Sequence, residues 1–138
     1  LSGRSTLVET GTEYARHALL PFNTSDIALC AAAASIDDDE YNELQRKTVL
    51  NGRDYFESAF ADLDLQAIPS QANFVAIVSP PLGSARLTEL LLQRGFIVRE
   101  LTTFGMKNAV RVSVGTMEEN MAFAQALKLI FETEGVAA

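Results

Sequence analysis

The feature that most constrains the fold is a short segment near the C-terminus in which apolar and polar side chains alternate strictly. Residues 109–116 read Ala-Val-Arg-Val-Ser-Val-Gly-Thr. Successive side chains of a β-strand point to opposite faces, so the three valines share one face, whereas Arg111 and Ser113 share the other. The segment is therefore predicted to be a strand with one face in a core. Arg111 projects from the opposite face, which makes it the best candidate for chemistry in the chain.

Two further segments are predicted to be strands, residues 69–78 and residues 96–98, because both are rich in β-branched and aromatic residues. From residue 37 onwards the predicted order is helix, strand, helix, strand, strand, helix. A strand–helix–strand crossover is normally right-handed and joins parallel strands, so we expect the first two strands to be parallel and the third antiparallel to one or both. The predicted fold class is α/β, with an α+β-like arrangement of two layers in which helices cover a small mixed β-sheet.

Several sequence signals predict where the helices begin and how they pack. Apolar residues at helical spacing predict one long amphipathic helix over residues 41–63, in which Gly52 allows a close approach. The acidic residues 37–40 are interpreted as the start of this helix rather than a metal site. Ser84 is the expected N-cap of the next helix, and Thr116 with Glu119 predicts a capping box for the last one.

The N-terminal part of the chain is predicted to be a separate helical segment, residues 1–36, ahead of an α/β domain over residues 37–138. A short helix is expected at residues 13–20, and Thr24 or Ser25 can cap an alanine-rich helix that follows. Cys30 lies in that alanine-rich run, where we expect it to be buried as a small hydrophobic residue.

Composition and charge exclude several classes of function. Eighteen acidic residues against eleven basic ones give a net charge of -7, which opposes binding to nucleic acid. No apolar run approaches the roughly 20 residues that a membrane span needs, so no membrane partner is expected. A lone cysteine and no visible secretory signal favour a reducing, cytoplasmic location.

The residues described so far carry a resemblance to a known family. Residues 69–74 read Pro-Ser-Gln-Ala-Asn-Phe, residues 93–99 read Gln-Arg-Gly-Phe-Ile-Val-Arg, and residues 110–120 read Val-Arg-Val-Ser-Val-Gly-Thr-Met-Glu-Glu-Asn. In this order they resemble the C-terminal small domain of histidinol-phosphate aminotransferases, which are fold-type-I enzymes that use pyridoxal phosphate. The resemblance covers about residues 20 to 132.

The resemblance implies roles for three residues. Arg111 matches the arginine that binds the α-carboxylate of the amino acid, and Arg99 matches an arginine that helps to hold the substrate phosphate. A planar fork of donors suits both oxyanions. Asn73 matches an asparagine near the site, where a backbone hydrogen bond is an equally good reading of its role. From the residues alone, a surface arginine on a sheet edge is the simpler reading of both Arg99 and Arg111.

The resemblance also implies a function and its limits. The family belongs to amino-acid biosynthesis and binds pyridoxal phosphate through a lysine in a Ser-Lys pair, which this sequence lacks. We therefore expect a transaminase substrate-binding domain that binds no cofactor alone and works with a pyridoxal-phosphate-binding large domain. The alternative is a stand-alone, non-catalytic module for ligand binding or protein interaction. A small carboxylate or phosphate is the expected ligand, and homodimerisation is expected to cover apolar surface.

Overall fold

The computed structural model describes residues 24–136, and the chain divides into two units between Asn42 and Glu43. The short helix predicted at residues 13–20 lies outside the described residues. The first unit contains helix α2 (Asp26–Ile36) and the start of α3 (Asp39–Ala61). The second unit contains the rest of α3 and, in chain order, the elements β1 (Gln66–Ile68), β2 (Phe74–Val78), α4 (Ser84–Gln93), β3 (Arg99–Glu100), the 3-10 helix η1 (Thr102–Phe104), β4 (Ala109–Ser113) and α5 (Met117–Glu134).

Local capping explains where the helices of the first unit begin. Ser25 is the N-cap of α2, and its hydroxyl accepts a hydrogen bond from the Ala28 amide at 3.2 Å. The carboxylate of Asp38 likewise accepts one from the Tyr41 amide at 2.9 Å, which confirms a capping role for the acidic run. The expected burial of Cys30 is wrong, because no residue of α2 is buried and the thiol is exposed.

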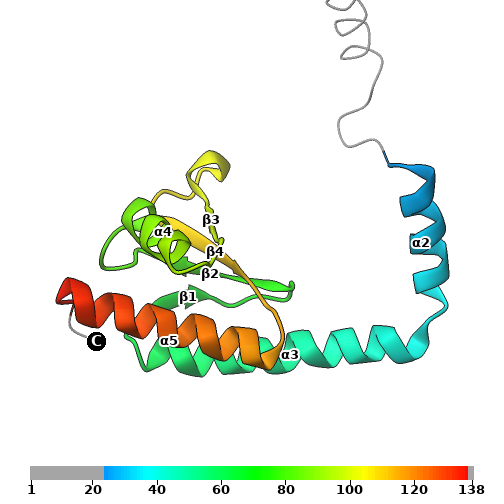
Figure 1. The fold of residues 1–138 in the computed structure, drawn as a ribbon, viewed down its shortest axis with the longest axis horizontal. Coiled ribbons are helices and arrows are strands. Elements are labelled where there is room, and N and C mark those ends of the chain that lie inside the picture. Colours follow the sequence, from blue (N-terminus) through cyan, green and yellow to red (C-terminus); the bar gives the residue numbers. More distant parts are fainter. Residues whose placement is uncertain (1–23, 137–138) are drawn as a thin grey trace, which may run out of the picture. The chain divides into compact units, whose positions relative to one another are not determined.

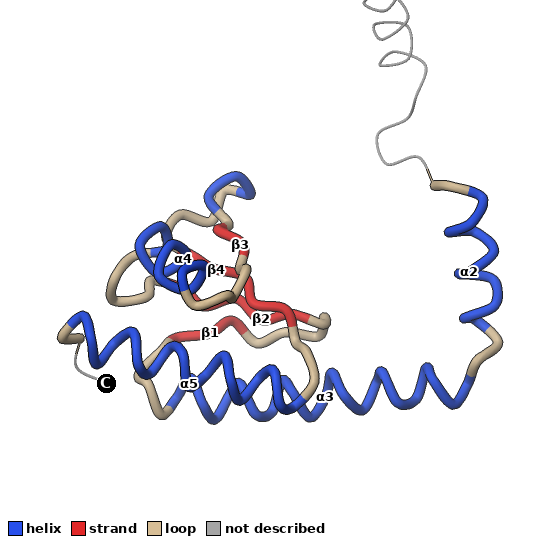
Figure 2. The backbone as a smooth tube through the Cα atoms, in the orientation of Figure 1, coloured by secondary structure: helices blue, strands red, loops and turns tan. Residues whose placement is uncertain are grey.

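The second unit has two layers, with helices on one face of a four-stranded sheet (Figures 1 and 2). The strand order is β1-β2-β4-β3, and each hydrogen-bonded pair is antiparallel. The α/β class with a helix-covered sheet is confirmed, but the sheet is antiparallel rather than mixed. Strands β2 and β3 do run in the same direction, because both are antiparallel to β4. Since β4 lies between them, they do not pair with each other.

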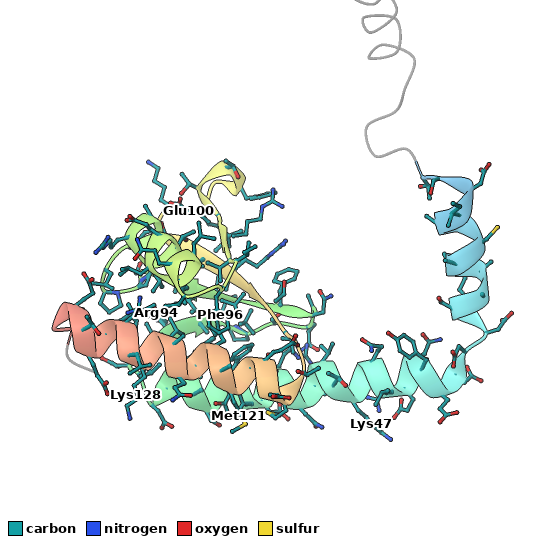
Figure 3. All side chains as sticks on the ribbon, in the orientation of Figure 1. Lys47, Arg94, Phe96, Glu100, Met121 and Lys128 are labelled. Atoms are coloured by element: carbon teal, nitrogen blue, oxygen red, sulfur yellow. The ribbon has the colours of Figure 1, made fainter. Side chains whose placement is uncertain are left out.

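Two strand positions also differ from the prediction. Residues 69–73 are a connection, and β1 was missed altogether. The strand predicted at residues 96–98 is instead β3, residues 99–100; Phe96 and Val98 pack against the core without forming a strand, and Ile97 is exposed. The Phe96 amide donates to the Leu91 carbonyl at 2.9 Å and thereby closes the end of α4. In Figure 3 Phe96 is labelled, and its ring packs edge-on against Phe123 at 5.6 Å.

The core lies between the sheet and helices α3, α4 and α5. Alternation places the side chains of Val110 and Val112 in it, as predicted, while Arg111 points away. Aromatic rings from two helices meet there, with Phe56 stacked on Phe60 and edge-on to Phe123. The fully or nearly buried members of this core include Phe56, Phe60, Ile77, Leu87, Leu91, Val110, Leu127, Ile130 and Phe131.

The remaining helix ends are set by side chains near the sheet. The capping box of α5 is confirmed, because Thr116 and Glu119 exchange hydrogen bonds between side chain and backbone. Ser84 is not the N-cap of α4. Gly83 holds that position with no side-chain cap of its own, and Ser84 is the first helical residue.

Within residues 24–136, none of the helices combines the length and the apolar character needed to cross a lipid bilayer.

Candidate functional site

The sheet brings four side chains into one row on the face that the helices leave open. The register pairs Ile68 with Ala76, Ala76 with Arg111, and Arg111 with Arg99. Directly opposed residues of antiparallel strands point to the same face. The row therefore runs from an apolar side chain on one edge strand, over the small Ala76, to two adjacent arginines on β4 and β3.

A cavity of about 700 Å³ lies on this face, and its wall is mostly apolar. Arg111 is the one charged residue among those that line it within the described part of the chain. Two of the lining residues, Ala76 and Leu101, form a small buried cluster with Ala109, and Met106 packs against this cluster. The lining comprises Ile68, Pro69, Ser70, Gln71, Ala72, Phe74, Ala76, Leu101, Phe104, Met106 and Arg111.

The guanidinium of Arg111 is held in place but keeps an unused donor. Its Cζ lies 5.1 Å from the centroid of the Phe74 ring, a distance at which a cation–π interaction is favourable. Its Nε is buried and has no hydrogen-bond partner in residues 24–136. A buried donor without a partner costs about 1–3 kcal/mol. An acceptor within hydrogen-bonding distance of this Nε would remove this cost.

Arg99 is exposed and stands next to Arg111 in the register of β3 and β4. Its Cζ lies 4.7 Å from the centroid of the Phe104 ring. A second cavity, of about 320 Å³, is lined by residues 97–99, Arg111 and Ser113, so Arg111 borders both cavities. Neither guanidinium forms an ion pair within residues 24–136. Two neighbouring cations with no acidic partner among the described residues form a local patch of positive charge on an acidic protein.

Asn73 lies outside the cavity that Arg111 lines, and its side chain is exposed. Its carbonyl accepts a hydrogen bond from the Val114 amide at 2.8 Å, which extends the pairing of β2 with β4. The structure thus brings Arg99 and Arg111 together and gives Asn73 a contact through its backbone.

The sequence reasoning missed the aromatic and sulfur-containing part of the wall. Phe104 and Met106 flank Gly105, whose φ of +81° allows the chain to turn at this point. Two large apolar residues around a glycine in a polar loop were an available signal, because such residues in a loop normally pack against something.

The described residues do not fit pyridoxal phosphate, which is held in enzymes through a lysine. None of the three lysines of the chain, Lys47, Lys107 and Lys128, lines either cavity at Arg111. The residues described in this chain therefore place two arginines beside an apolar wall, without the covalent anchor for that cofactor.

Comparisons with known proteins agree on one family. The model of the family "aminotransferase class I and II" matches residues 2–127. The histidinol-phosphate aminotransferase of Symbiobacterium thermophilum is 39% identical over 108 residues, which are 78% of this chain and 30% of that protein. Histidinol-phosphate aminotransferase 1 of Nitrosococcus oceani is 40% identical over 112 residues, 81% of this chain and 30% of that protein. The chain thus spans about 30% of the length of these curated relatives.

A solved structure supports the same fold. The histidinol-phosphate aminotransferase of Clostridium acetobutylicum superimposes with a TM-score of 0.72 over 86% of this chain and 36% of that chain, at 22% identity.

Proposed function

We propose, because the chain belongs to the class I and II aminotransferase family, that it supplies the C-terminal substrate-binding domain of a histidinol-phosphate aminotransferase-like transaminase. Pyridoxal phosphate is the cofactor of this family. In this role the chain recognises the substrate's anionic groups. The cofactor chemistry falls to a separate pyridoxal-phosphate-binding large domain, and we propose a homodimer as the working assembly.

The observation that carries the proposal is that Arg111 lines the larger cavity while its buried Nε has no hydrogen-bond partner among residues 24–136. A guanidinium offers parallel donors that match the two oxygens of a carboxylate, and each charged hydrogen bond contributes about 1.5–3 kcal/mol. The apolar wall around it excludes water and strengthens that bond. In this role Arg111 binds the α-carboxylate and orients the amino acid.

Arg99 is proposed to bind the phosphate group of the substrate. It is exposed and shares the smaller cavity with Arg111, so an anion there meets two cations. Asn73 is proposed to contribute through its carbonyl, which holds the end of β4 and thereby the strand that carries Arg111.

A second candidate function is a non-catalytic protein-interaction module with the same fold. It is supported by the apolar side chains that α2 presents to solvent, among them Ile27, at 83% exposure, and Ile36, at 74%. Within the transaminase proposal the same residues contact the large domain. One experiment separates the two functions, because only a transaminase domain restores activity to an incomplete relative.

The test is a chimera in which this chain replaces the matching region of the Nitrosococcus oceani enzyme. We expect the chimera to transaminate histidinol phosphate. Arg111→Ala should lower kcat/KM by about 100-fold or more, since two charged hydrogen bonds contribute at least about 3 kcal/mol and each 1.4 kcal/mol is tenfold.

The control variant is Arg86→Ala, which removes an exposed arginine that pairs with Glu89 and Glu134, and it should leave kcat/KM unchanged. A chimera that folds and binds pyridoxal phosphate but shows no transamination would overturn the proposal and favour the interaction module.

A further inference from the structure

We propose that Glu100 is a positioning residue that holds Arg99 and Phe104 in place from the opposite face of the sheet. Its carboxylate ties the edge strand β3 and the 3-10 helix η1 to the start of α4. The clamp itself is independent of the proposed function, and only its effect on anion binding rests on that function.

The clamp consists of two hydroxyl groups that donate to one carboxylate oxygen. Ser84 Oγ lies 2.7 Å from Glu100 Oε1, and Thr102 Oγ1 lies 2.9 Å from the same oxygen. Ser84 is only 5% exposed, so its hydroxyl is shielded from competing water. These bonds, that of Ser84 foremost and then that of Thr102, lower the pKa of Glu100 and keep it ionised.

A second contact ties the same region together at the N-terminus of α4. The Ser84 amide donates to Asn108 Oδ1 at 2.7 Å, so Asn108 supplies the cap that Gly83 lacks. The positive end of the α4 dipole also favours the Glu100 carboxylate nearby. Helix α4 is anchored in the core by Leu87, Leu90 and Leu91, which makes it a rigid support.

Strand β3 needs such support because it is short and lies at the edge of the sheet. It has two residues and pairs with β4 alone. Alternation sends Arg99 to the open face and Glu100 to the helical face. Figure 3 shows Glu100 beside α4, on the segment that leads into η1. A bond to Glu100 therefore holds the backbone of Arg99 without occupying the anion site.

The segment that follows Glu100 forms one wall of the larger cavity. Leu101, Phe104 and Met106 all line it, and the Phe104 amide donates to the Leu101 carbonyl at 2.9 Å. Thr102 begins η1, so the same carboxylate oxygen holds both the strand and the turn. Loss of the clamp should let this wall move and separate the Arg99 guanidinium from the Phe104 ring.

The first test compares Glu100→Ala with Glu100→Gln in the labelled chain by NMR, without ligand. The Phe104 ring shifts the side-chain resonances of Arg99 upfield while the two groups are stacked. We expect Glu100→Ala to lose this upfield shift. Glu100→Gln should keep it, because an amide oxygen still accepts both hydroxyl hydrogens. Glu89→Ala, which removes an exposed glutamate of α4, is the control and should change nothing.

If Glu100→Ala fails to fold, milder variants can still test the clamp. Ser84→Ala and Thr102→Val each remove one hydroxyl donor and should each reduce the upfield shift in part. Arg99 resonances that are unchanged in Glu100→Ala, or in both milder variants, would overturn the clamp.

The second test titrates inorganic phosphate into the same variants. We expect phosphate to shift the Arg99 and Arg111 resonances, with affinity about fivefold weaker in Glu100→Ala and no weaker in Glu100→Gln. If the upfield shift follows the clamp but phosphate does not bind the wild-type chain, the clamp stands and the proposed anion site fails. If phosphate binds all variants equally while the upfield shift follows the clamp, the clamp stands and its effect on anion binding is overturned.

Discussion

The hydrogen bonds of Asn120 connect the site to the stability of the fold, and their removal has a calculable cost. Asn120 is 2% exposed near the start of α5. Its Oδ1 accepts from the Gly115 amide at 2.9 Å, and its Nδ2 donates to the Gly115 carbonyl at 3.1 Å. Gly115 is the second residue after β4, so the Asn120 side chain holds the chain just beyond the strand that carries Arg111.

Asn120→Ala should lower the free energy of unfolding by about 1–2 kcal/mol. The loss of two hydrogen bonds costs about 1 kcal/mol each. Alanine returns up to about 0.7 kcal/mol through its higher helix propensity. Gly115 is half-buried, so water can satisfy part of what its backbone loses. The net result is a moderate destabilisation that spreads to the end of β4.

Urea unfolding followed by far-UV circular dichroism measures this change, since the chain has no tryptophan to report by fluorescence. The control is Asn51→Ala, the same substitution at an exposed position in the middle of α3. It should stabilise the chain by about 0.5 kcal/mol, from propensity alone. An Asn120→Ala variant within about 0.5 kcal/mol of wild type would refute the role given to these bonds.

Two further changes test the packing of α3 and the charges on its surface. Gly52→Ala should destabilise the fold by about 1–3 kcal/mol in the same urea assay. The reason is that an added Cβ would overlap Val114 Cγ1 and lie 2.6 Å from Asn120 Nδ2. An unchanged urea midpoint would mean that α3 shifts freely. Glu43 should titrate by NMR with a pKa of about 2, below its ordinary 4.5, chiefly because Arg46 donates hydrogen bonds to it. Because the pKa of Glu43 is lowered in the folded chain, the contribution of its ionised form to stability is present above about pH 4.5 and is lost as the pH falls towards 2. Arg46→Ala should raise the titration midpoint of Glu43. A midpoint that this variant does not move would exclude the ion pair as the cause.

Features with a strong local period could be predicted from the sequence. The alternation around Arg111 identified both faces of β4, because a one-residue error would bury a guanidinium and expose two valines. The capping box of Thr116 and Glu119 was equally readable, since all its partners lie within one helical turn. The close approach at Gly52 followed from the missing side chain in an otherwise amphipathic helix.

The remaining differences arise where distant residues decide the local structure. Residues 96–98 have the composition of a strand, yet Phe96 closes the end of α4 after Gly95, whose φ is +86°, and Phe96 and Val98 pack against the core. Strand β1 has only three residues, too few for an alternating pattern to identify it, so only its pairing with β2 reveals it. The order of the strands could not be predicted either, because the sequence of one strand does not determine which strand pairs with it.

The network around Ser84 shows the same limit at the level of single side chains. Serine is a common N-cap residue, but the hydroxyl of Ser84 donates a hydrogen bond to Glu100, 16 residues away. The cap of α4 comes from Asn108, 24 residues away, which adopts a positive φ of 56°. No periodic pattern in the sequence indicates either hydrogen bond, because each depends on how α4 packs beside β3.

The open face of the sheet combines two unfavourable features, and a bound ligand could remove both. The Nε of Arg111 is a buried donor without a partner in the described residues, and apolar side chains stand exposed around it, with Phe104 at 59% and Ile68 at 42%. Either feature alone lowers stability and would be replaced at little cost to the fold. A ligand that brings an oxyanion to Arg111 satisfies the donor, and whatever covers the ligand also covers the apolar wall. We therefore propose that ligand binding accounts for the arrangement, since the same contacts that complete the site also remove the cost of leaving it open.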